Sequence, residues 1–187
     1  MEISRQLKPM IYSSLFVALI SAGALLAIPL GPVPIVLQNM FVLLAGVILG
    51  PRWGVACVGI YLLIGGCGLP VFSSGRAGIG HLFGPTGGYL FGYLPCVFIT
   101  GLIAHGQNKN MVINALAMVT GSTLIYATGV PWLKYITGMT WTRALAFGMY
   151  PFIPGDILKI AAALVIIKSM GPYLKLSVEE KTESKLL

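Results

Sequence analysis

Acidic side chains are the scarcest feature of this chain. Its 187 residues include five Asp and Glu, and charged residues of both signs make up 9% of the chain against 57% that are hydrophobic. In a soluble domain about a quarter of the residues are charged, and a soluble fold of this size leaves too much surface in water to hide so many apolar side chains. The composition therefore excludes an ordinary soluble domain and predicts an integral membrane protein.

Motifs of catalysis and nucleotide binding are also missing. No G-x-x-x-x-G-K-[ST], H-E-x-x-H or G-x-S-x-G occurs. The three cysteines, Cys57, Cys67 and Cys96, form no close pair, which favours small buried hydrophobes over metal ligands or disulfides. We therefore expect a protein that is not an enzyme, with no catalytic residue, no metal and no cofactor.

Charge-free stretches long enough to cross a membrane recur along the chain. No charged residue lies between Lys8 and Arg52, which leaves room for two spans of about 20 apolar residues each. The runs lack the alternation of apolar and polar residues that marks a membrane β-barrel. The sequence predicts one transmembrane domain over 1–187 with six helices, over about 10–28, 35–49, 55–64, 89–104, 111–128 and 154–170.

Basic residues stand singly at the ends of the apolar runs rather than in the stripe that nucleic acid requires. With six spans and an internal N-terminus, the inside set is Arg5, Lys8, Arg52, Lys109, Lys168, Lys175, Lys181 and Lys185. The outside set is Arg76, Lys134 and Arg143. This bias follows the positive-inside rule. We expect a multi-pass plasma-membrane protein with both termini cytoplasmic and a disordered tail over about 175–187.

The connections differ in kind. The apolar run over 10–28 is long enough to span, so it predicts an uncleaved first helix rather than a signal peptide. Residues 129–152 predict an external connection, in which Trp132 and Trp141 lie at the outer interface.

Residues 65–88 are too rich in glycine for a stable helix and too apolar for a solvated linker. They predict a re-entrant, cavity-lining loop between the third and fourth helices; a plain mobile external loop is the alternative.

Asp156 is the only acidic residue between Glu2 and Glu179. An ionisable group inside a span costs about 2.5–3.5 kcal/mol on insertion scales and generally has a partner and a function. Lys159 follows three residues later, on the same helical face. The pair predicts a polar binding site near the outer face. The alternative is structural: Asp156 follows Pro154 in a first helical turn, where the helix dipole stabilises a carboxylate, so Asp156 would cap the helix and pair with Lys159.

Several weaker signals accompany this pair. Gln38 enters an otherwise apolar helix, so its amide needs a partner from a helix or a ligand. Phe72 and Tyr89 flank the glycine-rich segment as candidate walls of an apolar pocket. The two histidines, His81 and His105, are expected to be structural.

Small residues recur four apart at several places. Ala18 and Ala22 on the first helix predict close approach of another helix, from the same chain or a partner. Gly84, Gly88 and Gly92 have the same spacing, and for these we expect internal packing.

Together, several segments resemble the BioY family. The resemblance runs in order along nearly the whole chain and rests on Gly31-Pro32-Val33-Pro34-Ile35 with Gln38, Leu44-Ala45-Gly46, Leu49-Gly50-Pro51, Gly68-Leu69-Pro70-Val71-Phe72-Ser73, Gly84-Pro85-Thr86-Gly87-Gly88-Tyr89-Leu90, and Pro151-Phe152-Ile153-Pro154-Gly155-Asp156 with Lys159.

The resemblance implies a six-helix S component of an energy-coupling factor transporter, with a biotin pocket near the extracellular side. It implies that Ala18 and Ala22 are similar to the surface that meets a transmembrane coupling subunit, with separate cytoplasmic ATPases supplying the energy. The supply of energy by separate ATPases agrees with the absence of a phosphate-binding loop motif in this chain.

The resemblance also implies roles for the candidate residues. Asp156 can accept hydrogen bonds from the ureido ring of biotin, and Lys159 or Arg76 can pair with its carboxylate. Ser73 and Ser74 are the further polar groups of the glycine-rich segment. Phe72, Tyr89 and other apolar groups would cover the rest of the ligand, and Gln38 would contact it.

Two other functions stay open at this level. The same fold serves other vitamins, so a different small vitamin is the nearest rival ligand. A secondary transporter of a small carboxylate or vitamin, coupled to an ion through Asp156, is the alternative from another class. A membrane enzyme acting on a lipid is disfavoured because acids, histidines and nucleophile motifs are so few.

Overall fold

The structure is a computed structural model that describes residues 2–29, 32–104 and 110–183. The described chain is helical apart from one pair of two-residue strands. The elements in order are α1 (Glu2–Leu25), β1 (Ala27–Ile28), β2 (Ile35–Val36), α2 (Gln38–Gly66), η1 (Ser73–Gly75), α3 (Ile79–Leu82), α4 (Gly87–Ala104), α5 (Met111–Thr137), α6 (Trp141–Gly148), η2 (Tyr150–Phe152) and α7 (Ile153–Glu183). Of the positions interpreted above, Gly31, His105, Lys109 and Lys185 lie outside the described residues.

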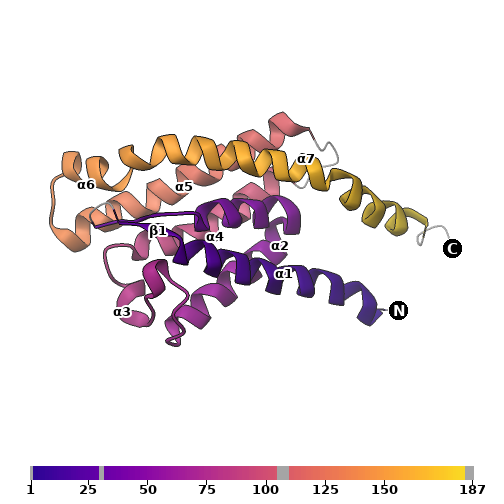
Figure 1. Cartoon of the computed structure of the whole chain (residues 1–187), viewed down its shortest axis with the longest axis horizontal. Helices are drawn as coiled ribbons and strands as arrows, with labels where there is room; N and C mark the ends of the chain where they lie inside the picture. The colour runs from indigo at the N-terminus through magenta and orange to yellow at the C-terminus, as the bar shows by residue number, and fades with distance from the viewer. Residues whose placement is uncertain (1, 30–31, 105–109, 184–187) are drawn as a thin grey trace.

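The long helices lie along a common axis (Figure 1). α1 begins and α7 ends at one end of this bundle, while β1, α3 and α6 lie at the opposite end (Figure 1). Five helical segments of the described chain are long and apolar enough to cross a membrane: Leu7–Leu25, Gln38–Gly66, Gly87–Ala104, Met111–Thr137 and Trp141–Ser169. The all-α, membrane-spanning architecture expected from the composition is therefore confirmed.

α2 is broken in its middle at Gly50, whose φ of 76° and ψ of −177° are not helical. A Cβ atom built on Gly54 would lie 3.6 Å from the carbonyl oxygen of Ala45. Nine residues along a straight helix would separate these positions by about 13 Å, so the chain turns back at Gly50. The break lies between the second and third predicted helices, which cover about 35–49 and 55–64. Glycine is suited to this position because a residue with a side chain is strained in this conformation.

α4 packs closely against α5, and the glycines of α4 permit this approach. A Cβ atom on Gly88 would overlap the side chain of Trp132, and one on Gly92 would overlap Thr128. Both partners are on α5. The prediction of internal packing is confirmed for Gly88 and Gly92.

Helix ends differ from the prediction at several places. α1 begins at Glu2 rather than at about residue 10, and α2 begins at Gln38 rather than at about residue 35, because Ile35 and Val36 form β2. α1 ends at Leu25 rather than at residue 28, because the chain leaves the helix for the antiparallel pairing of β1 with β2, in which Ala27 faces Val36. α5 continues to Thr137, so the external connection expected from residue 129 is wrong over its first nine residues. α7 continues to Glu183, where a disordered tail was expected from Lys175.

The glycine-rich segment folds into tight turns, η1 and α3, rather than into a long helix, as predicted. It is fastened to the end of α2 by a hydrogen bond of 2.7 Å from the N–H of Gly78 to the carbonyl of Gly65. The N–H of Phe72 also donates to the carbonyl of Arg76 at 3.0 Å, which closes the η1 turn. The segment is therefore held in place at the end of the bundle that carries β1 and α6 (Figure 1).

Candidate functional site

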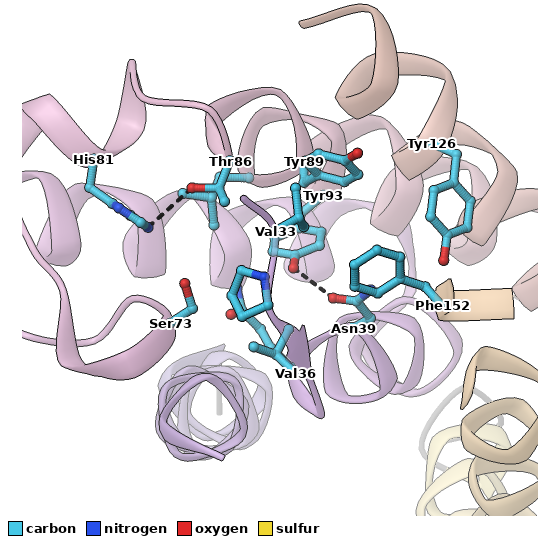
Figure 2. Close-up of a pocket in the computed structure, with 13 residues that line it drawn as sticks. Val33, Val36, Asn39, Ser73, His81, Thr86, Tyr89, Tyr93, Tyr126 and Phe152 are labelled. Atoms are coloured by element: carbon cyan, nitrogen blue, oxygen red, sulfur yellow. Dashed lines mark hydrogen bonds between the residues drawn. The ribbon is translucent and has the colours of Figure 1, made fainter. Parts of the chain in front are cut away.

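A small cavity lies where the β1–β2 connection, the glycine-rich segment, α4 and α5 meet (Figure 2). Its volume of about 40 Å³ has room for one or two waters. The lining combines apolar walls with hydroxyl, amide and imidazole groups. The residues that line it are Val33, Pro34, Val36, Gln38, Asn39, Ser73, His81, Thr86, Tyr89, Leu90, Tyr93, Tyr126 and Phe152.

Two amides enter the cavity from the first turn of α2. The Asn39 side chain accepts a hydrogen bond of 2.7 Å from the hydroxyl of Tyr93 (Figure 2). Gln38 is 1% exposed, and although its amide lies close to the Tyr61 hydroxyl, its Nε2 atom has no hydrogen-bond partner among the described residues. A buried donor without a partner is unfavourable by about 1–3 kcal/mol, so Gln38 offers a hydrogen bond to any acceptor that enters the cavity.

The glycine-rich segment contributes an imidazole. His81 stacks on the ring of Phe72, with the ring centres 5.3 Å apart, and its Nε2 lies 3.3 Å from the Thr86 hydroxyl. Burial, and then the nearby positive charge of Arg76, lower the pKa of His81 below its ordinary value. The histidine expected to be structural therefore stands at the cavity as a neutral polar group (Figure 2).

The pair Asp156 and Lys159 forms a buried ion pair in the first turns of α7. Lys159 Nζ lies 3.0 Å from Asp156 Oδ1, and the residues are 7% and 8% exposed, respectively. The second carboxylate oxygen, Oδ2, accepts a hydrogen bond from the hydroxyl of Tyr126 on α5. The predicted contact between the acid and the lysine is confirmed, and the structure adds the tyrosine.

The structure divides the predicted site residues into two groups. Gln38 and Tyr89 line the cavity, and the Tyr89 hydroxyl donates to the Gly148 carbonyl at 2.8 Å. Asp156 and Lys159 are not among the lining residues, but Asp156 accepts a hydrogen bond from one of them, Tyr126.

The other group does not line the cavity. Phe72 is 0% exposed and fills the core under Gly65, packed edge-on against Tyr61. Ser74 and Arg76 are exposed and do not line the cavity. The neighbouring serine, Ser73, lines it instead, because the φ of 59° at Ser74 turns the chain between them.

Several polar lining residues carried no functional prediction. Asn39 adjoins Gln38, and Tyr93 follows Tyr89 by one helical turn, so the spacing contained a signal for both. Tyr126 lies 30 residues from Asp156 in the sequence. Nothing local in the sequence indicates that Tyr126 meets Asp156.

The candidate interface residues lie apart from this cavity. Ala18 and Ala22 are exposed on α1, with exposed Leu15 and Leu25 on the same helix. Within the described chain these alanines are not packed against another helix, as internal packing would require.

Comparisons with known proteins identify the family of this chain. A sequence model described as the BioY family matches residues 1–175. The chain is 41% identical over 157 residues to a probable biotin transporter BioY of Pyrococcus horikoshii, covering 84% of this chain and 92% of the relative. It is 39% identical over 160 residues to the biotin transporter BioY of Thermotoga maritima, covering 86% and 94% of the two chains.

The fold has a solved counterpart. The crystal structure of the S-component for biotin from an ECF-type ABC transporter matches with a TM-score of 0.84 and 30% sequence identity. The match covers 90% of this chain and 93% of the other. By the family match along nearly its whole length and by these relatives, this chain belongs to the BioY family.

Proposed function

We propose that this protein is a biotin-binding S component, the membrane subunit that captures the vitamin for an uptake transporter energised by separate subunits. The observation that carries the proposal is the likeness, over nearly the whole of both chains, to the S-component for biotin. The names of the curated relatives support the same ligand. In this role the chain binds and moves its ligand and catalyses no reaction.

The cavity supports a ligand that has a compact polar head and an apolar body. The unpartnered Gln38 Nε2 suits a ureido carbonyl oxygen, which needs a donor. Asp156, held by Lys159, suits the ureido N–H groups, since a carboxylate accepts strong hydrogen bonds. Tyr89 and Phe152 cover the apolar body.

The ligand carboxylate requires a cation. Lys159 is already paired with Asp156. Arg76 is exposed, and Asp156 is the only acidic residue over 7–169, so no carboxylate in that range pairs with Arg76. This distribution favours Arg76 over Lys159 as the partner of the ligand carboxylate, with Ser73 as the nearby hydroxyl that lines the cavity.

The membrane topology belongs to the same proposal. Counting α2 as two spans, 38–49 and 51–66, gives six, and the glycine-rich segment is then a re-entrant loop. α1 begins and α7 ends at the same end of the bundle (Figure 1), which suits an even number of spans with both termini cytoplasmic in the plasma membrane. The cavity would then open to the outside.

A purified-protein binding measurement tests the proposal. Asp156→Asn and Lys159→Ala are each expected to weaken biotin binding more than about tenfold, which corresponds to about 1.4 kcal/mol. The first removes the carboxylate that accepts the ureido N–H groups, and the second removes the cation that holds this carboxylate in place. Binding is measured by calorimetry in detergent, with the melting temperature as the test of folding.

Lys168→Ala is the matched control, since it removes an exposed lysine from the same helix. It is expected to bind biotin as the wild type does. Undiminished affinity in both Asp156→Asn and Lys159→Ala rejects the site, and a wild-type protein that binds another vitamin in preference to biotin rejects the ligand.

The second candidate function is ion-coupled secondary transport, favoured by the single buried acid, Asp156. Uptake by vesicles separates the two. An ATP-coupled protein takes up no biotin in ATP-depleted vesicles, even when an ion gradient is imposed and the coupling subunits are present. Gradient-driven uptake in the absence of ATP contradicts the S-component proposal.

A further inference from the structure

The cavity is too small for the ligand that its lining suits. Ligand sites typically enclose about 300–1,000 Å³, whereas this cavity measures about 40 Å³. The acid that suits the ureido head does not reach the cavity, because Asp156 is not among its lining residues. At least one side chain between the cavity and Asp156 must move when a ligand binds the acid.

Tyr126 is the side chain that joins the two. It lines the cavity, and its hydroxyl donates to Asp156 Oδ2. Figure 2 draws Tyr126 and Phe152 at the end of the cavity opposite His81. Of these two end groups only Tyr126 can hydrogen-bond to the acid, since the Phe152 ring has no donor.

Both oxygens of Asp156 are occupied in this arrangement. Oδ1 faces Lys159 Nζ at 3.0 Å, and Oδ2 faces the Tyr126 hydroxyl. Because Tyr126 lines the cavity and Asp156 does not, the Tyr126 O–H stands between the cavity and Oδ2, on the path by which a ureido N–H would approach the acid. A donor from the ligand cannot take that position until the donor from the protein leaves it.

We propose that Tyr126 is an internal competitor for the ligand: its hydroxyl satisfies Asp156 in the free protein and is displaced by a ligand N–H on binding. The inference rests on the proposed function, and it adds an affinity-determining residue to the site. Displacement removes one hydrogen bond for each one formed, so Tyr126 lowers the affinity of the site while it keeps the buried acid partnered in the absence of ligand.

This competition predicts the direction in which removing the Tyr126 hydroxyl changes the affinity for biotin. Tyr126→Phe keeps the ring and removes the hydroxyl, so Asp156 Oδ2 has no tyrosine donor in the free state, and the ligand N–H has nothing to displace. The free protein becomes less stable, while the bound protein is affected less because the ligand supplies the donor. Biotin is therefore expected to bind about threefold to tenfold more tightly and to associate faster, the range that one net hydrogen bond supports.

The experiment compares four proteins by calorimetry and stopped-flow binding of biotin in detergent: wild type, Tyr126→Phe, Tyr126→Met and Asp156→Asn. Tyr126→Met also lacks the hydroxyl and fills the space with a flexible apolar chain. It therefore tests for the same increase in affinity if the phenylalanine variant does not fold. Tyr93→Phe is the matched control, because it removes another hydroxyl of the cavity lining, one that donates to Asn39 rather than to Asp156. It is expected not to tighten binding.

The outcomes distinguish failure of the Tyr126 proposal from failure of the proposed biotin-binding function. Tighter binding by the Tyr126 variants, with a lower melting temperature of the free protein, supports the competitor. Unchanged or weaker binding by the Tyr126 variants overturns it, and leaves the proposed function intact if wild type binds biotin and Asp156→Asn does not. Equal tightening by Tyr93→Phe also overturns it, since the gain would not depend on Asp156. No binding of biotin by the wild type overturns both.

Discussion

At the scale of single residues, His81 makes the stability of the folded protein depend on pH. Burial and the charge of Arg76 lower its pKa in the folded protein below the unfolded value of about 6.5. Since the folded state favours the neutral imidazole, the unfolded state binds protons more readily as the pH falls. The contribution of His81 to stability is therefore complete above about pH 6.5 and is lost as the pH falls through the folded pKa.

The melting temperature measured from pH 7.5 to pH 5 tests this prediction. The wild type is expected to lose stability below about pH 6.5, and His81→Gln is expected to lose less, because glutamine does not titrate. Both are measured in a His105→Gln background, so that His81 is the only imidazole. Parallel curves for the two proteins contradict the assignment.

Prediction at this scale succeeds where partners are local. Asp156 and Lys159 are three residues apart, and helical geometry alone brings them together. Tyr126, which completes the group, approaches from another helix. Its position depends on how α5 packs against α7, and no spacing within one segment contains that information.

At the scale of elements, turn residues identify a helix end only when they do not have a second role. The sequence predicts that the fifth helix ends at about Thr128, before Gly129 and Pro131, yet α5 runs through both to Thr137. A Cβ atom on Gly129 would overlap the ring of Tyr89. Gly129 is therefore needed for helix packing rather than for a turn. The sequence alone does not distinguish a glycine that packs against another helix from one that ends a helix.

Gly50 illustrates the other case, in which glycine is required by the backbone. Its φ of 76° and ψ of −177° lie in a region that is essentially restricted to glycine. Gly50→Ala is expected to destabilise the protein by about 1–3 kcal/mol and to lower its melting temperature in detergent.

Gly59 on the same element is the matched control for Gly50. A Cβ atom there would meet no atom within 4 Å, and its φ is not positive. Gly59→Ala is expected to leave the melting temperature unchanged or to raise it, since alanine is the better helix former. An equal loss in both variants shows that the break at Gly50 has no special requirement for glycine.

At the scale of the whole molecule, the cavity and the face of α1 proposed for coupling lie on different surfaces. The cavity is enclosed by the β1–β2 connection, the glycine-rich segment, α4 and α5, with Phe152 from η2. The small-residue face of α1, with Ala18 and Ala22, is exposed. No residue of this face lines the cavity, so the two functions of the proposed S component can be changed independently.

Ala18→Leu and Ala22→Leu test this separation. Two helices approach closely only where small side chains leave their backbones accessible, so a larger side chain on this face is expected to reduce ATP-dependent biotin uptake by about tenfold or more in the assembled transporter. Biotin binding by the isolated subunit is expected to stay within about twofold of the wild type, because the substituted side chains lie outside the cavity.

Leu15→Phe is the control for bulk on this helix. Leu15 is 52% exposed and is already large, so the enlarged side chain adds apolar surface without closing a small-residue approach. It is expected to preserve both binding and uptake. Loss of biotin binding in the alanine variants assigns Ala18 and Ala22 to internal packing instead. Full uptake by both alanine variants contradicts a coupling contact on this face of α1.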